Sequence, residues 1–228
     1  MARQNLIPAG LLLLSAIPVV AGSLRLTELA GGASTLPDSD RITSLPVPVA
    51  IHIISVTVFS ILGAFQFAPS FRRRRRGWHR AAGRVVLPCG IVAALSGLWL
   101  TLFLPRSPAD SALLAVIRVA VAAAMVTFLV LGYRAVRRRE FTRHRAWMIR
   151  GYAIGLGAGT QAFTQAPWLI LIGTLTPAGK VVTLTAGWLI NILAAEWIIR
   201  RGRTGRVARR LPGLEPAPSA APRPPRQP

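Results

Sequence analysis

Acidic residues and lysine are scarce in this chain. Only 7 of its 228 residues are Asp or Glu, and Lys180 is the single lysine among 28 basic residues. Charged residues make up 15% of the chain, whereas a soluble domain contains about a quarter. The arginines form blocks separated by long uncharged stretches, which is typical of a polytopic membrane protein. A nucleic-acid-binding domain would spread its basic residues through a polar fold, so we expect no nucleic-acid partner.

Cysteine and closely spaced acidic residues are also nearly absent. Cys89 is the single cysteine, which excludes an internal disulfide and a cysteine-based zinc site. The sequence shows no paired carboxylates, no Ser-His-Asp set and no metal-ligand spacing. We therefore predict no catalytic residue and no metal site, and favour a protein that is not an enzyme.

Long hydrophobic runs are abundant, and 52% of the residues are hydrophobic. A transmembrane helix needs about 20 mostly apolar residues. Six runs meet this requirement, and the sixth is the weakest because Lys180 and Glu196 bracket it and Asn191 lies within it. The sequence thus predicts an all-α bundle of about six transmembrane helices within residues 1–210, with spans at about 6–24, 47–67, 85–104, 112–133, 147–173 and 181–199.

The distribution of arginine between loops predicts the orientation, because basic residues beside a span are retained in the cytoplasm. The 71–84 and 134–146 connections and the segment after 199 hold most of the arginines, whereas basic and acidic residues nearly cancel in the alternate loops. We expect a bacterial inner-membrane protein with both termini in the cytoplasm and with membrane lipids as partners.

The two ends of the chain have further interpretations. Arg3, the leucine-rich run after it and the small residues Ala21-Gly22-Ser23 also fit a secretory signal peptide. Cleavage there would leave the remaining topology unchanged. Residues 211–228 are rich in proline and predict a disordered cytoplasmic tail.

Two basic segments are alike and carry a family resemblance. Trp78-His79-Arg80-Ala81 precedes the third span, and His144-Arg145-Ala146-Trp147 begins the fifth. Together with His52 and the segment Gly63-Ala64-Phe65-Gln66-Phe67, this order resembles the DUF2306 family of predicted bacterial membrane proteins over about residues 46–170. The resemblance implies a multi-span membrane protein and assigns no catalytic residue.

Polar residues inside the spans are candidates for a binding site, because an ionisable group in a membrane is costly. His52, Arg118, Gln161 and Gln165 all fall near the outer ends of their predicted spans. We expect them to line one outer-leaflet pocket that suits a quinone carbonyl, a carboxylate or a lipid headgroup. In that pocket Arg118 would lie within reach of His52 or of one glutamine. The alternative is that Arg118 extends to the headgroups and His52 is an ordinary interfacial residue.

The two inner histidines suggest another function. His79 and His144 could be axial ligands of a b-type haem between the third and fifth helices, since haem iron accepts imidazole on both faces. Gly151, Gly155 and Gly159 recur every four residues and would support close helix packing there. The chain would then be a membrane electron-transfer protein. A small transporter with interrupted helices is a third hypothesis. The sequence specifies neither the ligand nor any protein partner.

Overall fold

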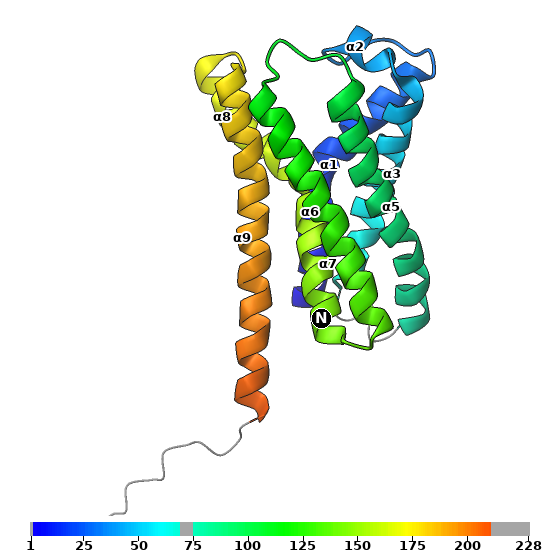
Figure 1. Ribbon diagram of the computed structural model, residues 1–228, viewed down its shortest axis with the longest axis vertical. Helices are drawn as coiled ribbons and strands as arrows, with labels where there is room; N and C mark the ends of the chain where they lie inside the picture. Colours follow the sequence, from blue (N-terminus) through cyan, green and yellow to red (C-terminus); the bar gives the residue numbers. More distant parts are fainter. Residues whose placement is uncertain (1, 69–74, 211–228) are drawn as a thin grey trace, which may run out of the picture.

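The computed structural model describes residues 2–68 and 75–210, and within these residues it contains helices and no strand (Figure 1). The expected proline-rich tail and Arg72 to Arg74 lie outside the described residues. The helices are α1 (Ala2–Leu29), α2 (Ser39–Thr43), α3 (Pro46–Gln66), α5 (Arg76–Phe103), α6 (Ala112–Arg137), α7 (Phe141–Gly155), α8 (Gly157–Ile172) and α9 (Pro177–Arg210).

Five of these helices are long and apolar enough to cross a bilayer. They are Leu6–Leu29, Pro46–Gln66, Arg76–Phe103, Ala112–Arg137 and Pro177–Gly202, with mean hydropathies between 1.6 and 2.5. The shortest has 21 residues and is therefore about 31 Å long, which matches the hydrocarbon thickness. The predicted all-α polytopic membrane fold is confirmed.

The region of the fifth expected span, 147–173, differs from one continuous helix. Helix α7 ends at Gly155 and α8 begins at Gly157, and Leu156 between them has ψ 0°, far from the value of about −42° in a regular α-helix. Glycine is a poor helix former, and here it also permits close packing. A Cβ at Gly157 would meet the Trp188 indole, and one at Gly159 would meet the Leu14 carbonyl. Helix α9 contacts both α7 and α8 along this broken span.

The arginine-rich segments gather at one end of the bundle. The short connection from α6 to α7, the start of α5 and the late part of α9 lie at the lower end in Figure 1, and α2 lies at the opposite end. We call these the arginine-rich end and the α2 end. The described arginine-rich end carries Arg75, Arg76, Arg80, Arg84, Arg134, Arg137, Arg138, Arg139, Arg143, Arg145, Arg200 and Arg201.

The core lies where α3, α5, α6 and α7 meet. Phe59 and Leu129 are fully buried, and the Phe59 and Tyr152 ring centroids are 5.4 Å apart. The Tyr152 hydroxyl donates a hydrogen bond of 2.7 Å to the Ser60 carbonyl, which satisfies its polar atom inside the bundle. Met125 belongs both to this core and to the wall of a cavity that extends toward the α2 end.

Candidate functional site

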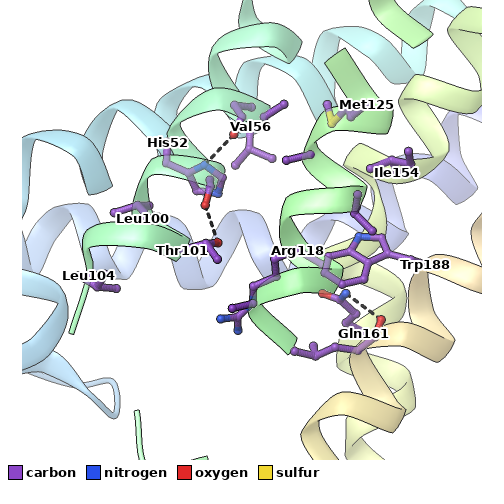
Figure 2. A pocket seen from close by; sticks show the side chains of 18 of the residues that line it. His52, Val56, Leu100, Thr101, Leu104, Arg118, Met125, Ile154, Gln161 and Trp188 are labelled. Carbon is purple, nitrogen blue, oxygen red and sulfur yellow. Dashed lines mark hydrogen bonds between the residues drawn. The ribbon is translucent and has the colours of Figure 1, made fainter. Parts of the chain in front are cut away.

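A cavity of about 390 Å³ lies in the helical bundle (Figure 2), and its lining includes Arg41 of α2 and Arg106 and Asp110 of the 104–111 loop, so it reaches the α2 end. Its volume lies within the range of small-molecule sites, about 300–1,000 Å³. Charged side chains lie where loops and helix ends border it, and apolar side chains line its interior. The charged residues are Arg41, Arg106, Asp110 and Arg118, and the apolar ones include Val56, Met125, Ile154, Leu184 and Trp188.

The charged group at the mouth of the cavity is organised around Asp110. One carboxylate oxygen, Oδ1, lies 3.3 Å from Arg118 Nη2 and 3.0 Å from Lys180 Nζ. Asp110 thereby joins the 104–111 loop to both α6 and α9. On the other side, Arg41 Nη1 donates a 3.1 Å hydrogen bond to the Pro105 carbonyl of the same loop. The loop is therefore held at two points beside the cavity.

The mouth carries net positive charge. Burial alone would raise the pKa of the Asp110 carboxyl, but Lys180, Arg118 and the Ser107 N–H together hold that pKa below its usual value. Asp110 is thus ionised at neutral pH. Three arginines and this one carboxylate line the cavity, and Arg106 is exposed without an ion pair to any side chain in the described part of the chain. An anionic group is favoured here.

His52 lies deeper, between two cavities. Its Nδ1 is 3.0 Å from the Ala93 carbonyl oxygen and 3.1 Å from Ser96 Oγ, both on α5. The imidazole fits against Gly97, where a Cβ would approach its Cε1 to 3.1 Å. His52 also lines a second cavity of about 190 Å³ between α1, α3 and the α7–α8 break. It therefore forms part of the wall that separates the two spaces.

The two glutamines of α8 are placed differently. Gln161 lines the main cavity, is 8% exposed, and donates from Nε2 to the Leu184 carbonyl at 3.0 Å. Gln165 is not among the residues that line either described cavity, and its Nε2 donates to the Gln161 carbonyl at 3.2 Å. Three of the four residues that we expected in one pocket, His52, Arg118 and Gln161, thus border the same space.

Arg118 contacts an acidic residue that sequence analysis did not assign to it. Its described ion-pair partner is Asp110, and within residues 2–68 and 75–210 no hydrogen bond joins it to His52, Gln161 or Gln165. Sequence reasoning treated Asp110 and Lys180 as loop charges that cancel. The available signal was the isolation of Asp110, which is the only acid between the two predicted spans nearest to it and lies two turns before Arg118.

The two inner histidines lie away from these cavities. His79 and His144 are near the starts of α5 and α7, at the arginine-rich end, and neither lines the two cavities described here. His144 Nδ1 is 2.8 Å from the Gly132 carbonyl oxygen, which fixes the ring against α6. Among the described residues no cluster of His, Cys, Asp and Glu could hold a metal ion.

Comparison with known proteins agrees with the fold. The model of a family described as predicted membrane protein (DUF2306) matches residues 49–199. No curated protein and no solved structure matches the chain. The matched segment runs from α3 into α9 and contains all but one of the residues that line the main cavity, the exception being Arg41. The chain belongs to the DUF2306 family of predicted membrane proteins.

Proposed function

We propose that this membrane protein binds a small amphipathic molecule whose anionic head lies at the mouth of the main cavity. The supporting observation is one continuous space that joins three arginines to an apolar interior formed by residues such as Met125 and Trp188. A guanidinium group binds carboxylate or phosphate oxygens by charge-assisted hydrogen bonds. Apolar walls favour the hydrocarbon part of the same molecule.

Competition with Asp110 sets a requirement on the head group. Arg118 and Lys180 already share one carboxylate, so a neutral head would gain little from them. Arg106 has no such partner among the described residues, and Arg41 makes its ion pair with the exposed Asp38 at 3.1 Å. A ligand anion would therefore bind first to these two arginines, with Arg118 beside it.

The orientation of the protein is part of the proposal. Basic residues next to membrane spans are retained on the cytoplasmic side, and most of the described arginines cluster at the end opposite the cavity mouth. The α2 end would then face the outside of a bacterial inner membrane. The ligand would enter from the outer leaflet or from the aqueous phase beyond it.

Transport of the same ligand is a second candidate function. Interrupted helices with irregular backbone beside a cavity are a feature of secondary transporters. Gly155, at the break between α7 and α8, lines both cavities, and Leu156 lines the second one. Flux of a radiolabelled anion into proteoliposomes, compared with empty liposomes, would separate transport from binding alone.

The binding proposal is tested with three probes that share a twelve-carbon chain. Laurate, dodecanol and dodecyltrimethylammonium would be titrated against the full-length protein in detergent and followed by native mass spectrometry. We expect laurate to bind most tightly, and Arg118→Gln and Arg106→Gln each to weaken it about 10-fold, as loss of a charged hydrogen bond does. Arg84→Gln is the matched control, because Arg84 is exposed on α5 at the arginine-rich end. Equal affinity for all three probes would contradict the proposal.

A further inference from the structure

We infer that the apolar body of this ligand carries a hydrogen-bond donor, such as an alcohol or phenol hydroxyl, which the interior of the main cavity accepts. The inference rests on the proposed function and adds the chemistry of the deeper contacts. It concerns three neutral polar side chains between the charged mouth and the apolar wall, His52, Thr101 and Gln161 (Figure 2). Each has hydrogen committed to a backbone carbonyl, which leaves acceptor atoms for the cavity.

The tautomer of His52 follows from its two partners. The Ala93 carbonyl oxygen can only accept a hydrogen bond, so Nδ1 must carry a proton. The hydroxyl hydrogen of Ser96 is committed to the Val92 carbonyl at 2.6 Å, so Ser96 Oγ also accepts from His52. In the neutral imidazole Nε2 is then an acceptor. No hydrogen bond within the described residues occupies Nε2.

Thr101 and Gln161 present acceptors for the same reason. The Thr101 hydroxyl donates its only hydrogen to the Gly97 carbonyl at 2.8 Å, which leaves the lone pairs of Oγ1. Gln161 donates from Nε2 to the Leu184 carbonyl, and Figure 2 shows its side-chain oxygen on the side of Arg118. The second Nε2 hydrogen of Gln161 is the remaining donor of these three groups.

This pattern discriminates between two otherwise similar ligands. A hydroxyl can donate to His52 Nε2 or Thr101 Oγ1, whereas a carbonyl or an ether has no hydrogen to donate. A buried acceptor left unpaired on ligand binding also loses its solvation. The cavity should therefore favour a phenol or a hydroquinone over the corresponding methyl ether or quinone. Arg41, Arg106 and Arg118 at the mouth only donate hydrogen bonds, so they favour acceptor oxygens and would bind the anionic head.

The test uses 4-nonylphenol and its methyl ether, 4-nonylanisole, which differ in the hydroxyl hydrogen and a methyl group. Both would be titrated against the full-length protein by native mass spectrometry. One hydrogen bond of ordinary strength predicts that the phenol binds about 3- to 10-fold more tightly than the ether. His52→Asn should abolish this preference, because the Asn amide can replace Nδ1–H at Ala93 but has no atom in the place of Nε2. Thr101→Val is a second variant and should reduce the preference.

The matched control is His144→Asn. His144 also contacts a backbone carbonyl through Nδ1, at Gly132, but it lies at the other end of the bundle, so its substitution should leave the preference intact. Equal binding of phenol and ether to the natural protein would overturn the inference, as would a preference that survives both His52→Asn and Thr101→Val. If laurate binding still depends on Arg118 in that case, the proposed function stands. If none of the probes binds, both proposals fail together.

Discussion

Arg150 of α7 and Glu196 of α9 form a two-point ion pair between helices. Arg150 Nε lies 2.5 Å from Glu196 Oε1, and Nη2 lies 2.9 Å from Oε2. The guanidinium also lies 4.8 Å from the centroid of the Trp147 ring. Two parallel hydrogen bonds fix the relative orientation of the guanidinium and the carboxylate as well as the distance between them. The pair therefore sets how α9 packs against the first half of the broken span.

Removing either partner should destabilise the protein more than removing both. Glu196→Ala leaves a guanidinium without its counter-ion, and Arg150→Ala leaves a carboxylate in the same position. Because the two side chains are partly exposed, at 19% and 29%, each single substitution should lower the free energy of unfolding by about 1 to 3 kcal/mol. The double variant Arg150→Met with Glu196→Leu should be closer to the natural protein, because it leaves no unpaired charge. Denaturant unfolding in detergent measures this, and single variants as stable as the double variant would contradict it.

The sequence was sufficient for the architecture but not for this pair. Long uncharged runs identify spans because their length alone must match the bilayer. Pairing between Arg150 and Glu196 depends on how two helices rotate against each other, which hydropathy does not encode. The sequence did not predict the break at Leu156 for a similar reason. Beside the break, Gly157 packs against Trp188 and Gly159 against Leu14, and these partners come from distant parts of the chain.

The ion pairs of Asp110 with Arg118 and Lys180 predict that stability depends on pH. Because the native pKa of Asp110 lies below its usual value, its contacts stabilise the protein above the unfolded pKa of about 3.9. That stabilisation is lost as pH falls through the lower native pKa. Asp110→Asn should reduce stability at pH 7 and flatten the acid limb of a melting-temperature profile. Asp40→Asn, in α2, is the control, and an unchanged acid limb in Asp110→Asn would contradict the prediction.

Gly97 allows a prediction about the position of His52. A methyl group at residue 97 would approach His52 Cε1 to 3.1 Å, so Gly97→Ala should displace the ring from Ala93. We expect the phenol preference to fall at least about 3-fold, the effect of one weakened hydrogen bond, while the protein remains folded. Gly83→Ala in the same helix is the control, because a Cβ there meets nothing within 4 Å. If Gly97→Ala and Gly83→Ala showed the same preference for the phenol, His52 would not be the acceptor of its hydroxyl hydrogen.

Topology can be measured with single cysteines after Cys89→Ala. Cysteines at positions 75 and 138, at the arginine-rich end, should not react with an impermeant maleimide added to intact cells. A cysteine at position 35, in the exposed segment before α2, should react. Lysed cells should label all three, which controls for accessibility. Strong labelling at position 75 or 138 in intact cells would show that the arginine-rich end faces outside and would contradict the proposed orientation.

The haem hypothesis makes a separate spectral prediction. The contact of His144 Nδ1 with the Gly132 carbonyl leaves its Nε2 as the atom that would bind iron, so the visible spectrum of the protein purified from its native membrane tests the hypothesis, and a spectrum without a Soret band would contradict it. A Soret band that is lost in both His79→Ala and His144→Ala, and retained in His52→Ala, would instead support bis-histidine ligation.

The candidate site was partly predictable because depth along a helix can be counted. His52 and Arg118 each lie six residues from the α2 end of their helices and Gln161 lies deeper, eleven residues from the end of α8, and the structure places all three around one cavity. Gln165 is one turn from Gln161 and shares its helix face only approximately. Its exclusion from the cavity, like the pairing of Arg118 with Asp110, depends on helix rotation and on the course of the 104–111 loop.

Photolabelling tests the central claim most directly. A laurate analogue with a diazirine near its hydrocarbon end would be bound to the full-length protein and irradiated, with and without excess laurate. Peptide mapping would then identify the labelled residues. Our account predicts laurate-sensitive labelling at cavity residues Met125, Ile154 or Trp188, and weaker labelling at the same probe concentration in Arg118→Gln. Labelling confined to outward-facing residues such as Ile170, Leu171 and Leu193, unaffected by competing laurate, would show that the molecule only partitions into surrounding detergent and would contradict the account.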